Sequence, residues 1–287
     1  MFKLDLLPMT KELTNIAGNL WSNTLIRGSH SERVDHLLLH EFYNRKYIVP
    51  NKLGTPKLKE GLYKSERKKA AHSGGFVLEP QKGLFDKYVL LLDFNSLYPS
   101  IILENNICFT TIDRPRKETT NESNNSKTPA KNKGNQVKKD EGEAAEEEAA
   151  FETQPPEPGL TQAILPSIID GLLKKRESAK DEMTKAKIDK DFDKEWQYNL
   201  KQNALKLTAN STYGCLGFQS SRFYCPAMAA LITRLGRGLL ISTKAKIEES
   251  TDLGYPVVYG DTDSVMVLPP HVEYDKAYEV GENIQQY

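Results

Sequence analysis

Residues 257–267 read VVYGDTDSVMV, and this stretch says more about the fold than any other part of the chain. Two apolar, β-branched half-strands flank a Gly-Asp-Thr-Asp tip, which is the pattern of a β-hairpin. The tip carries two carboxylates, Asp261 and Asp263. In extended geometry, residues two apart share one face of a strand, so both carboxylates are expected to point the same way. Taken alone, the tip is equally compatible with an ordinary β-turn, because Gly and Asp are common in turns.

A third aspartate, Asp93, ends another apolar run. Residues 84–92 alternate and then become continuously apolar, which predicts a buried strand, and the polar stretch from Asn95 to Ser100 ends it. If this strand lies beside the hairpin, Asp93 completes an acidic cluster. Carboxylates from separate strands can hold two Mg²⁺ ions roughly 4 Å apart, an arrangement that catalyses phosphoryl transfer. The sequence therefore predicts a two-metal site.

Composition bounds the protein class. The chain has 287 residues, 38% hydrophobic content and a formal net charge of zero, so it can bury a sizeable core and its overall charge predicts no polyanionic partner. Locally, residues 52–69 hold seven basic side chains against two acidic ones. That cluster is compatible with a solvated face or with a phosphate-binding surface.

The cysteines and the N-terminus point to a soluble, intracellular protein. Cys108, Cys215 and Cys225 are odd in number and have neither disulfide-framework nor zinc-ligand spacing, which fits a reducing compartment. The sequence shows neither a signal peptide nor an apolar run of membrane-spanning length.

Residues 113–160 interrupt the ordered pattern. They turn polar, pass through the acidic run DEGEAAEEE at 140–148 and reach a proline cluster. Such a segment cannot bury enough apolar surface to offset its ordering entropy. We expect a disordered surface insertion between two parts of one folded unit, acting as a passive loop or as an acidic interaction tract.

Helical patterns follow the insertion. Residues 166–213 predict two antiparallel helices with a break near 189–193, and residues 227–249 predict a more apolar third helix. Arg176 and Lys180 share one face of the first helix, and Lys206 and Asn210 share one face of the second. These faces could bind a triphosphate through an Arg fork and Lys charges. By helical spacing alone, the many other lysines of this region favour a solvated surface over a triphosphate site.

Three stretches resemble, in order, motifs A, B and C of the family B DNA polymerases. They are DFNSLYPSII at 93–102, KLTANSTYG at 206–214 and YGDTDS at 259–264. The likeness runs from about Leu13 to the end, apart from the insertion. Shorter stretches at 13–19, 31–33, 47–50, 106–111 and 214–218 are similar to the eukaryotic polymerase alpha branch of the family.

The resemblance implies a role for each matching residue. Asp93, Asp263 and the Phe94 carbonyl would hold two Mg²⁺ ions, with Asp261 as a supporting carboxylate near the primer end. Tyr98 would lie beneath the sugar and exclude a 2′-hydroxyl. The incoming triphosphate would be bound by the backbone amides of Ser96 and Leu97 together with Arg176, Lys180, Lys206 and Asn210. Tyr213 and Gly214 would shape the floor under the nascent base pair.

Candidate DNA contacts precede motif A. Gly74 and Gly75 match the glycines of a template-contact motif, although His72 stands where that motif has tyrosine. Lys68 and Lys69 are further candidates for DNA binding.

The resemblance also implies an α/β fold, a polymerase palm with a helical fingers insertion. The expected division is 1–80 for the end of an exonuclease-like region and linker, 81–112 and 215–287 for the two palm blocks, 113–160 for the insertion and 161–214 for the fingers. A thumb is expected to be missing, because the chain ends soon after motif C.

The implied function is template-directed addition of deoxynucleotides from dNTPs to a primer 3′ end. By resemblance it would act on primer–template DNA and RNA–DNA primers in replication initiation and lagging-strand synthesis, in the nucleus, with primase and an accessory polymerase subunit. Two alternatives remain. A non-catalytic DNA- or nucleotide-binding fragment would explain the missing thumb, and a metal-dependent nuclease would explain the aspartates but neither Arg176 nor Tyr98.

Overall fold

A computed structural model describes residues 5–28, 30–51, 74–113, 153–249, 254–270 and 273–286. The predicted DNA contacts Lys68 and Lys69 and the neighbouring His72 lie outside these ranges, as do residues 114–152 of the insertion. The elements in chain order are α1 (Leu6–Ala17), α2 (Trp21–Arg27), α3 (His30–Asn44), β1 (Leu90–Asp93), α4 (Leu97–Glu104), α6 (Ile164–Ile188), α7 (Phe192–Gly217), α8 (Pro226–Glu249), β2 (Val257–Asp261), β3 (Ser264–Val267) and α9 (Tyr274–Gln286).

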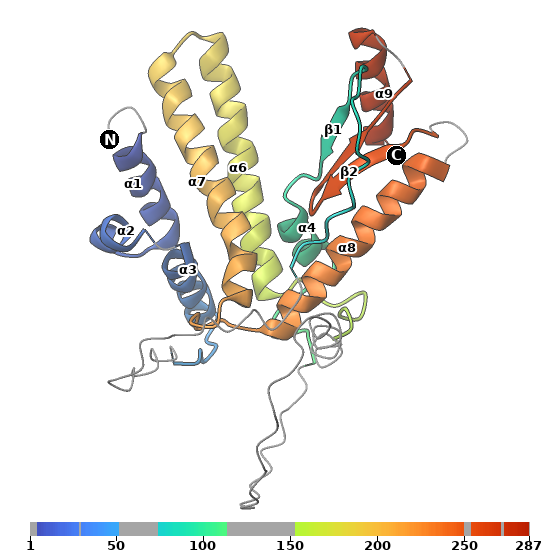
Figure 1. Cartoon of the computed structure of the whole chain (residues 1–287). Coiled ribbons are helices and arrows are strands. Elements are labelled where there is room, and N and C mark those ends of the chain that lie inside the picture. Colours follow the sequence, from blue (N-terminus) through green and yellow to red (C-terminus); the bar gives the residue numbers. More distant parts are fainter. Residues whose placement is uncertain are drawn as a thin grey trace, which may run out of the picture.

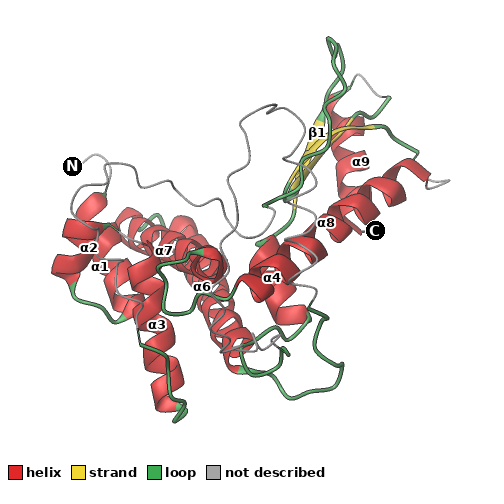
Figure 2. Cartoon of the chain, turned by 60° about the horizontal axis from the view of Figure 1, so that its bottom comes forward, coloured by secondary structure: helices red, strands yellow, loops and turns green. Residues whose placement is uncertain are grey.

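These elements form two neighbouring halves (Figures 1 and 2). Helices α1 and α3 pack on the long α6–α7 pair, while the small sheet packs with α8 and α9. Helix α4 contacts α6, α7 and α8, so it joins the two halves. The residues that follow β1 are therefore placed where the halves meet.

The α6–α7 pair confirms the predicted antiparallel helices and their break. Helix α6 ends at Ile188, Lys190 adopts a positive φ of 56°, and Asp191 caps α7 by accepting a hydrogen bond from the Lys194 N–H at 3.2 Å. The capping carboxylate satisfies a donor that the first helical turn leaves unpaired. The predicted third helix is confirmed as α8.

One apolar core holds the helical elements together. Fully buried side chains come from α3, α4, α6, α7 and α8, among them Leu38, Ile102, Leu165, Leu205 and Met228. Because these five helices share one core, the position of α4 is fixed by packing on several sides.

The sheet has the order β1-β3-β2, and both pairs are antiparallel. A second core beneath it includes Leu240, Ile247, Val265 and Ile284. Leu90 and Leu92 pack against this core, whereas Leu91 is 62% exposed. The prediction of a buried strand over 84–92 is wrong: only Leu90–Asp93 forms a strand, and only one of its faces is covered by described residues.

A further extended segment runs along the free edge of β2. The Leu78 N–H donates to the Gly260 carbonyl at 2.8 Å, and the Gln81 N–H donates to the Val258 carbonyl at 2.9 Å. The Thr262 N–H donates in turn to the Phe76 carbonyl at 2.9 Å. Residues 76–81 therefore support the acidic hairpin from the side opposite β1.

Described residues on both sides of the insertion form hydrogen bonds with other parts of the fold. The Asn106 side chain donates to the Thr161 carbonyl at 3.0 Å and accepts from the Ala163 N–H at 2.8 Å. Thr153 is buried, and its carbonyl accepts a hydrogen bond from Arg234. These bonds attach the described residues on both sides of the insertion to the rest of the fold.

Candidate functional site

The hairpin tip has a tight turn at Thr262 and Asp263. Asp261 pairs with Ser264, and the Asp263 N–H donates to the Asp261 carbonyl at 2.5 Å. Thr262 has a φ of 55°, in the left-handed region that a β-branched residue rarely adopts. The expected extended geometry from Asp261 to Asp263 is therefore wrong, because the chain reverses between the two residues.

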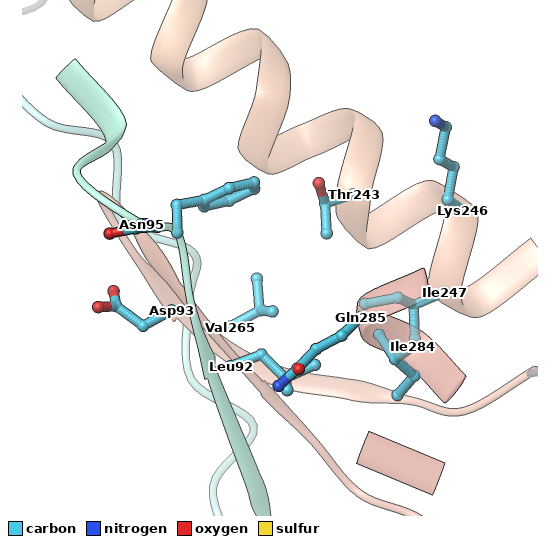
Figure 3. Close-up of a pocket in the computed structure, with 10 residues that line it drawn as sticks. Leu92, Asp93, Asn95, Thr243, Lys246, Ile247, Val265, Ile284 and Gln285 are labelled. Atoms are coloured by element: carbon cyan, nitrogen blue, oxygen red, sulfur yellow. The ribbon is translucent and has the colours of Figure 1, made fainter. Parts of the chain in front are cut away.

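The end of β1 lies against this tip. Asp93 pairs with Ser264 in the β1–β3 register, and the Phe94 N–H donates to the Asp263 carbonyl at 2.8 Å. The sequence made Asp93 part of the acidic cluster on the condition that its strand lies beside the hairpin, and the structure meets that condition. Figure 3 shows the Asp93 carboxylate pointing away from Ile247 and Ile284, on the opposite side of the strand from the second core.

Negative charge is concentrated where the end of β1 meets the hairpin tip. Partial burial raises the pKa of Asp263, and the negative charges of Asp93 and then Asp261 raise it further. Lys206 acts in the opposite direction on the pKa of Asp263. Burial, followed by the charges of Asp263 and Asp261, also raises the pKa of Tyr98. A cation bound here would relieve this repulsion.

The side-chain oxygens near the hairpin tip meet the needs of a divalent cation such as Mg²⁺ only in part. Within the described ranges no three His, Cys, Asp or Glu side chains are grouped tightly enough to hold a metal, so the predicted three-carboxylate cluster is not formed. Asp261 is engaged elsewhere, because it accepts hydrogen bonds from the Thr262 hydroxyl at 2.9 Å and the Tyr259 hydroxyl at 3.4 Å. Asp93 and Asp263 are both exposed and supply the carboxylate oxygens that Mg²⁺ prefers, and Mg²⁺ commonly keeps several waters and needs only one or two carboxylates.

A cavity of about 220 Å³ lies beside these two aspartates. It collects residues from the β1–α4 corner, α6, α7 and the hairpin: Asp93, Phe94, Asn95, Ser96, Leu97, Tyr98, Pro99, Arg176, Lys206, Asn210 and Asp263. The structure thus brings together most of the predicted metal and triphosphate ligands. Lys180 lies one turn further along α6 and is not part of the lining.

The cavity walls carry donors suited to an anion. The Arg176 Nε is buried and has no hydrogen-bond partner among the described residues, an uncommon state for a guanidinium nitrogen. Ser96, with a φ of 54°, precedes the first residue of α4, whose initial N–H groups have no intrahelical acceptors. Together with Lys206, these groups can bind a multiply charged oxyanion.

Two tyrosine rings pack against each other at the edge of the cavity. The ring centroids of Tyr98 and Tyr213 are 4.3 Å apart and the rings are tilted by 33°. Tyr98 lines the cavity, whereas Tyr213 supports it from α7. Gly214 is exposed, and no atom lies within 4 Å of the place where its Cβ would be.

Gly75 has a steric role that its sequence motif does not reveal. A Cβ at Gly75 would lie 2.3 Å from the Thr262 Oγ1 and 2.9 Å from the Thr262 Cγ2, whereas a Cβ at Gly74 would meet nothing within 4 Å. The bare backbone of Gly75 therefore allows the chain to pass against the hairpin tip. Only the fold could show this, because the two glycines are indistinguishable by type.

A second cavity, of about 330 Å³, lies behind the end of β1 (Figure 3). Its walls include Leu92, Phe94, Val265, Ile247 and Ile284, and Asn95, Thr243, Lys246 and Gln285 add polar groups. No sequence pattern predicts this cavity, because its residues come from four separate segments.

Comparison with known proteins supplies the family. The model of DNA polymerase family B matches residues 19–287. This chain belongs to that family. It is 45% identical over 307 residues to the DNA polymerase alpha catalytic subunit of Sterkiella nova, an alignment that covers 99% of this chain and 19% of that protein. It is 41% identical over 300 residues to the mouse DNA polymerase alpha catalytic subunit, covering 99% of this chain and 18% of that protein.

The fold agrees with this membership. The structure of the family B DNA polymerase from Pyrobaculum calidifontis matches with a TM-score of 0.65 at 24% identity, covering 99% of this chain and 31% of that one. The chain thus spans less than a fifth of the two curated relatives. None of the described helices is long and apolar enough to span a bilayer.

The close approach of Gly75 to Thr262 predicts that alanine substitution lowers stability at Gly75 but not at Gly74. We expect Gly75→Ala to lower the free energy of unfolding by about 1–3 kcal/mol, because the methyl group must displace Thr262. Gly74→Ala is the matched control and should change stability by no more than about 0.5 kcal/mol. Urea unfolding measures both. Combining Gly75→Ala with Thr262→Gly should restore much of the loss, and equal effects of the two alanine variants would contradict the contact.

The raised pKa of Tyr213 predicts that stability depends on pH. Burial, with a smaller contribution from Tyr98, raises the pKa of Tyr213 from 10.0 to about 12. Because the folded pKa lies above the unfolded one, the stabilisation is fully present below pH 10 and is lost as the pH rises through about 12. The difference in tyrosinate absorbance between the wild type and Tyr213→Phe should therefore titrate near pH 12. A difference that titrates near pH 10 would show that the Tyr213 hydroxyl is not buried.

Proposed function

We propose that this chain forms the nucleotidyl-transfer centre of a DNA-directed DNA polymerase. It adds deoxynucleoside monophosphates from dNTPs to a primer 3′ end during DNA replication. The observation that carries the proposal is the meeting of Asp93 and Asp263 with Arg176, Lys206 and Asn210 around one cavity. Family B membership supports the same reaction class.

The acidic side of the cavity would hold divalent metal ions, on which family B polymerases generally depend. Asp93, Asp263 and the Phe94 carbonyl are the proposed ligands for two Mg²⁺ ions, and Asp261 is a supporting carboxylate near the primer end. Bound there, the ions supply activation of the 3′-hydroxyl and neutralisation of the leaving pyrophosphate. The protein contributes mainly by holding the reacting groups in position.

The basic side would bind the triphosphate. Arg176 offers a planar fork and Lys206 a point charge, and Asn210 adds a neutral donor one turn from Lys206. The N–H groups of Ser96 and Leu97 complete the set at the start of α4. Lys180 extends the same basic face of α6 beyond the cavity.

The sugar and base would lie next to the two packed tyrosine rings. Tyr98 is the proposed barrier to a 2′-hydroxyl, with Tyr213 and Gly214 below the nascent base pair. Gly74 and Gly75, with Lys68 and Lys69, are the proposed DNA contacts. In this assignment β1 to β3 with α8 and α9 are the palm, α6 and α7 are the fingers, and residues 1–80 remain the end of an exonuclease-like region and linker.

The names of the relatives extend the proposal beyond this site. As part of a polymerase alpha catalytic subunit, the chain would act in the nucleus in replication initiation and lagging-strand synthesis. Its substrates would be dNTPs, primer–template DNA and RNA–DNA primers, and its partners primase and an accessory subunit. The curated relatives carry this name and extend far beyond the matched region.

A second candidate is a non-catalytic nucleotide- or DNA-binding segment of such a polymerase. It is favoured by the donor set, because no three His, Cys, Asp or Glu side chains of the described residues are grouped to hold a metal, whereas the buried Arg176 Nε is still able to donate to an oxyanion.

Primer extension distinguishes the two candidates. We expect the purified chain with Mg²⁺ to extend a labelled primer, and we expect Asp263→Asn to reduce extension at least about a hundredfold because a metal ligand is lost. The matched control Asp275→Asn, an exposed aspartate on α9, should extend like the wild type.

Arg176→Met adds a test that is independent of turnover. It should weaken dNTP binding at least about tenfold without lowering stability, since it removes a buried donor that has no protein partner. The matched control is Lys187→Met, an exposed position on the same helix, which should bind dNTPs like the wild type. Extension unaffected by Asp263→Asn would refute the catalytic proposal. No extension, with dNTP binding that depends on Arg176, would establish the binding-segment alternative.

A further inference from the structure

Helix α8 passes α4 at a glycine. A Cβ at Gly236 would lie 3.3 Å from the Tyr98 Cε1, 3.5 Å from the Ile101 Cδ1 and 3.5 Å from the Leu97 Cδ2. Glycine in the middle of a helix is destabilising relative to alanine, so its presence here needs a reason. The close approach of the Tyr98 ring supplies one.

Gly238 shows that the contact is specific. It lies on the same helix two residues later, and a Cβ there would meet nothing within 4 Å. Gly236 is buried and Gly238 is exposed. The two positions share one helical backbone but differ in what an added methyl group would touch.

The Tyr98 ring is held from two sides. Its centroid is 4.3 Å from that of Tyr213 on α7, slightly shorter than the roughly 4.5–7 Å usual for packed aromatic pairs, and its Cε1 faces Gly236 on α8. A ring packed this closely against Tyr213 has little room to yield in that direction. A methyl group at position 236 would therefore push the ring toward the cavity that Tyr98 lines.

We propose that Gly236 is a positioning residue that sets the placement of the Tyr98 ring, and through it the selection between deoxyribonucleotides and ribonucleotides. The inference rests on the proposed polymerase function and on the proposed contact of Tyr98 with the sugar. Gly236 touches no substrate. Its effect passes through the phenol ring, in a cavity of about 220 Å³ where small displacements change the fit of a nucleotide.

The consequence of Gly236→Ala is a narrower sugar site. A 3.3 Å Cβ contact requires the ring to move by a few tenths of an ångström. Deoxynucleotides should then bind less well, with the KM for dNTPs raised and kcat little changed. Ribonucleotides, which carry the additional hydroxyl, should be rejected more strongly, so that the ratio of dNTP to rNTP incorporation rises by about tenfold.

The test compares Gly236→Ala with Gly238→Ala in the full chain, each also combined with Tyr98→Ala. We expect Gly236→Ala alone to raise the discrimination ratio, and we expect the effect to vanish when the Tyr98 ring is absent. Gly238→Ala should leave the ratio unchanged in both backgrounds. Equal ratios for the two alanine variants, or a Gly236→Ala effect that persists in Tyr98→Ala, would overturn the inference.

A structural measurement separates this inference from the proposed function. In NMR spectra, Gly236→Ala should shift the Tyr98 ring resonances and alter the cross-peaks between Tyr98 and Tyr213, and Gly238→Ala should not. A wild-type chain that extends no primer would refute the proposed function, while the ring shifts would still test the placement of Tyr98. Primer extension by the wild type with unmoved ring resonances in Gly236→Ala would refute the inference alone.

Discussion

The hydrogen bond from the Phe94 N–H to the Asp263 carbonyl, 2.8 Å long, joins two segments that are far apart in the sequence. Together with the pairing of Asp93 and Ser264 it brings the two carboxylates to one place. The same corner starts α4, which packs on α6, α7 and α8. The cavity and the position of Tyr98 depend on this junction, because the residues that follow Asp93 form one side of the cavity. Arg176 and Lys206 line the same cavity from α6 and α7.

The junction carries an electrostatic cost. Burial and the neighbouring carboxylates raise the pKa of Asp263, and the buried Arg176 Nε has no partner in the described protein. Two non-glycine residues, Ser96 and Thr262, adopt positive φ angles beside the cavity. Strained backbone and unpaired charge concentrate at functional sites, where a ligand can offset their cost. Acidic and basic walls facing one cavity suit a metal-bound polyphosphate.

The sequence predicted the elements better than their exposure. The break between α6 and α7 and the adjacency of Asp93 to the hairpin followed from helical periodicity, turn residues and the family likeness. The strand over 84–92 failed, because alternation cannot show how much of a sheet face is covered. Helical spacing correctly placed Lys180 on the same face of α6 as Arg176. It could not show that Lys180 lies outside the cavity lining. The left-handed turn at Thr262 has no signal in residue type, because a β-branched residue rarely adopts that conformation. The contact of Gly236 with Tyr98 has none either, since it joins segments remote in sequence.

The central claim is that Asp93 and Asp263 act together in binding the divalent cations. Titration with Mn²⁺, followed by electron paramagnetic resonance of the free ion, tests it most directly. Asp93→Asn and Asp263→Asn should each weaken Mn²⁺ binding about tenfold, and the double variant should lose little more than either single variant, since both remove the same site. Asp275→Asn should bind like the wild type. Unchanged Mn²⁺ binding in the single variants, or losses that add as for independent sites, would contradict the account.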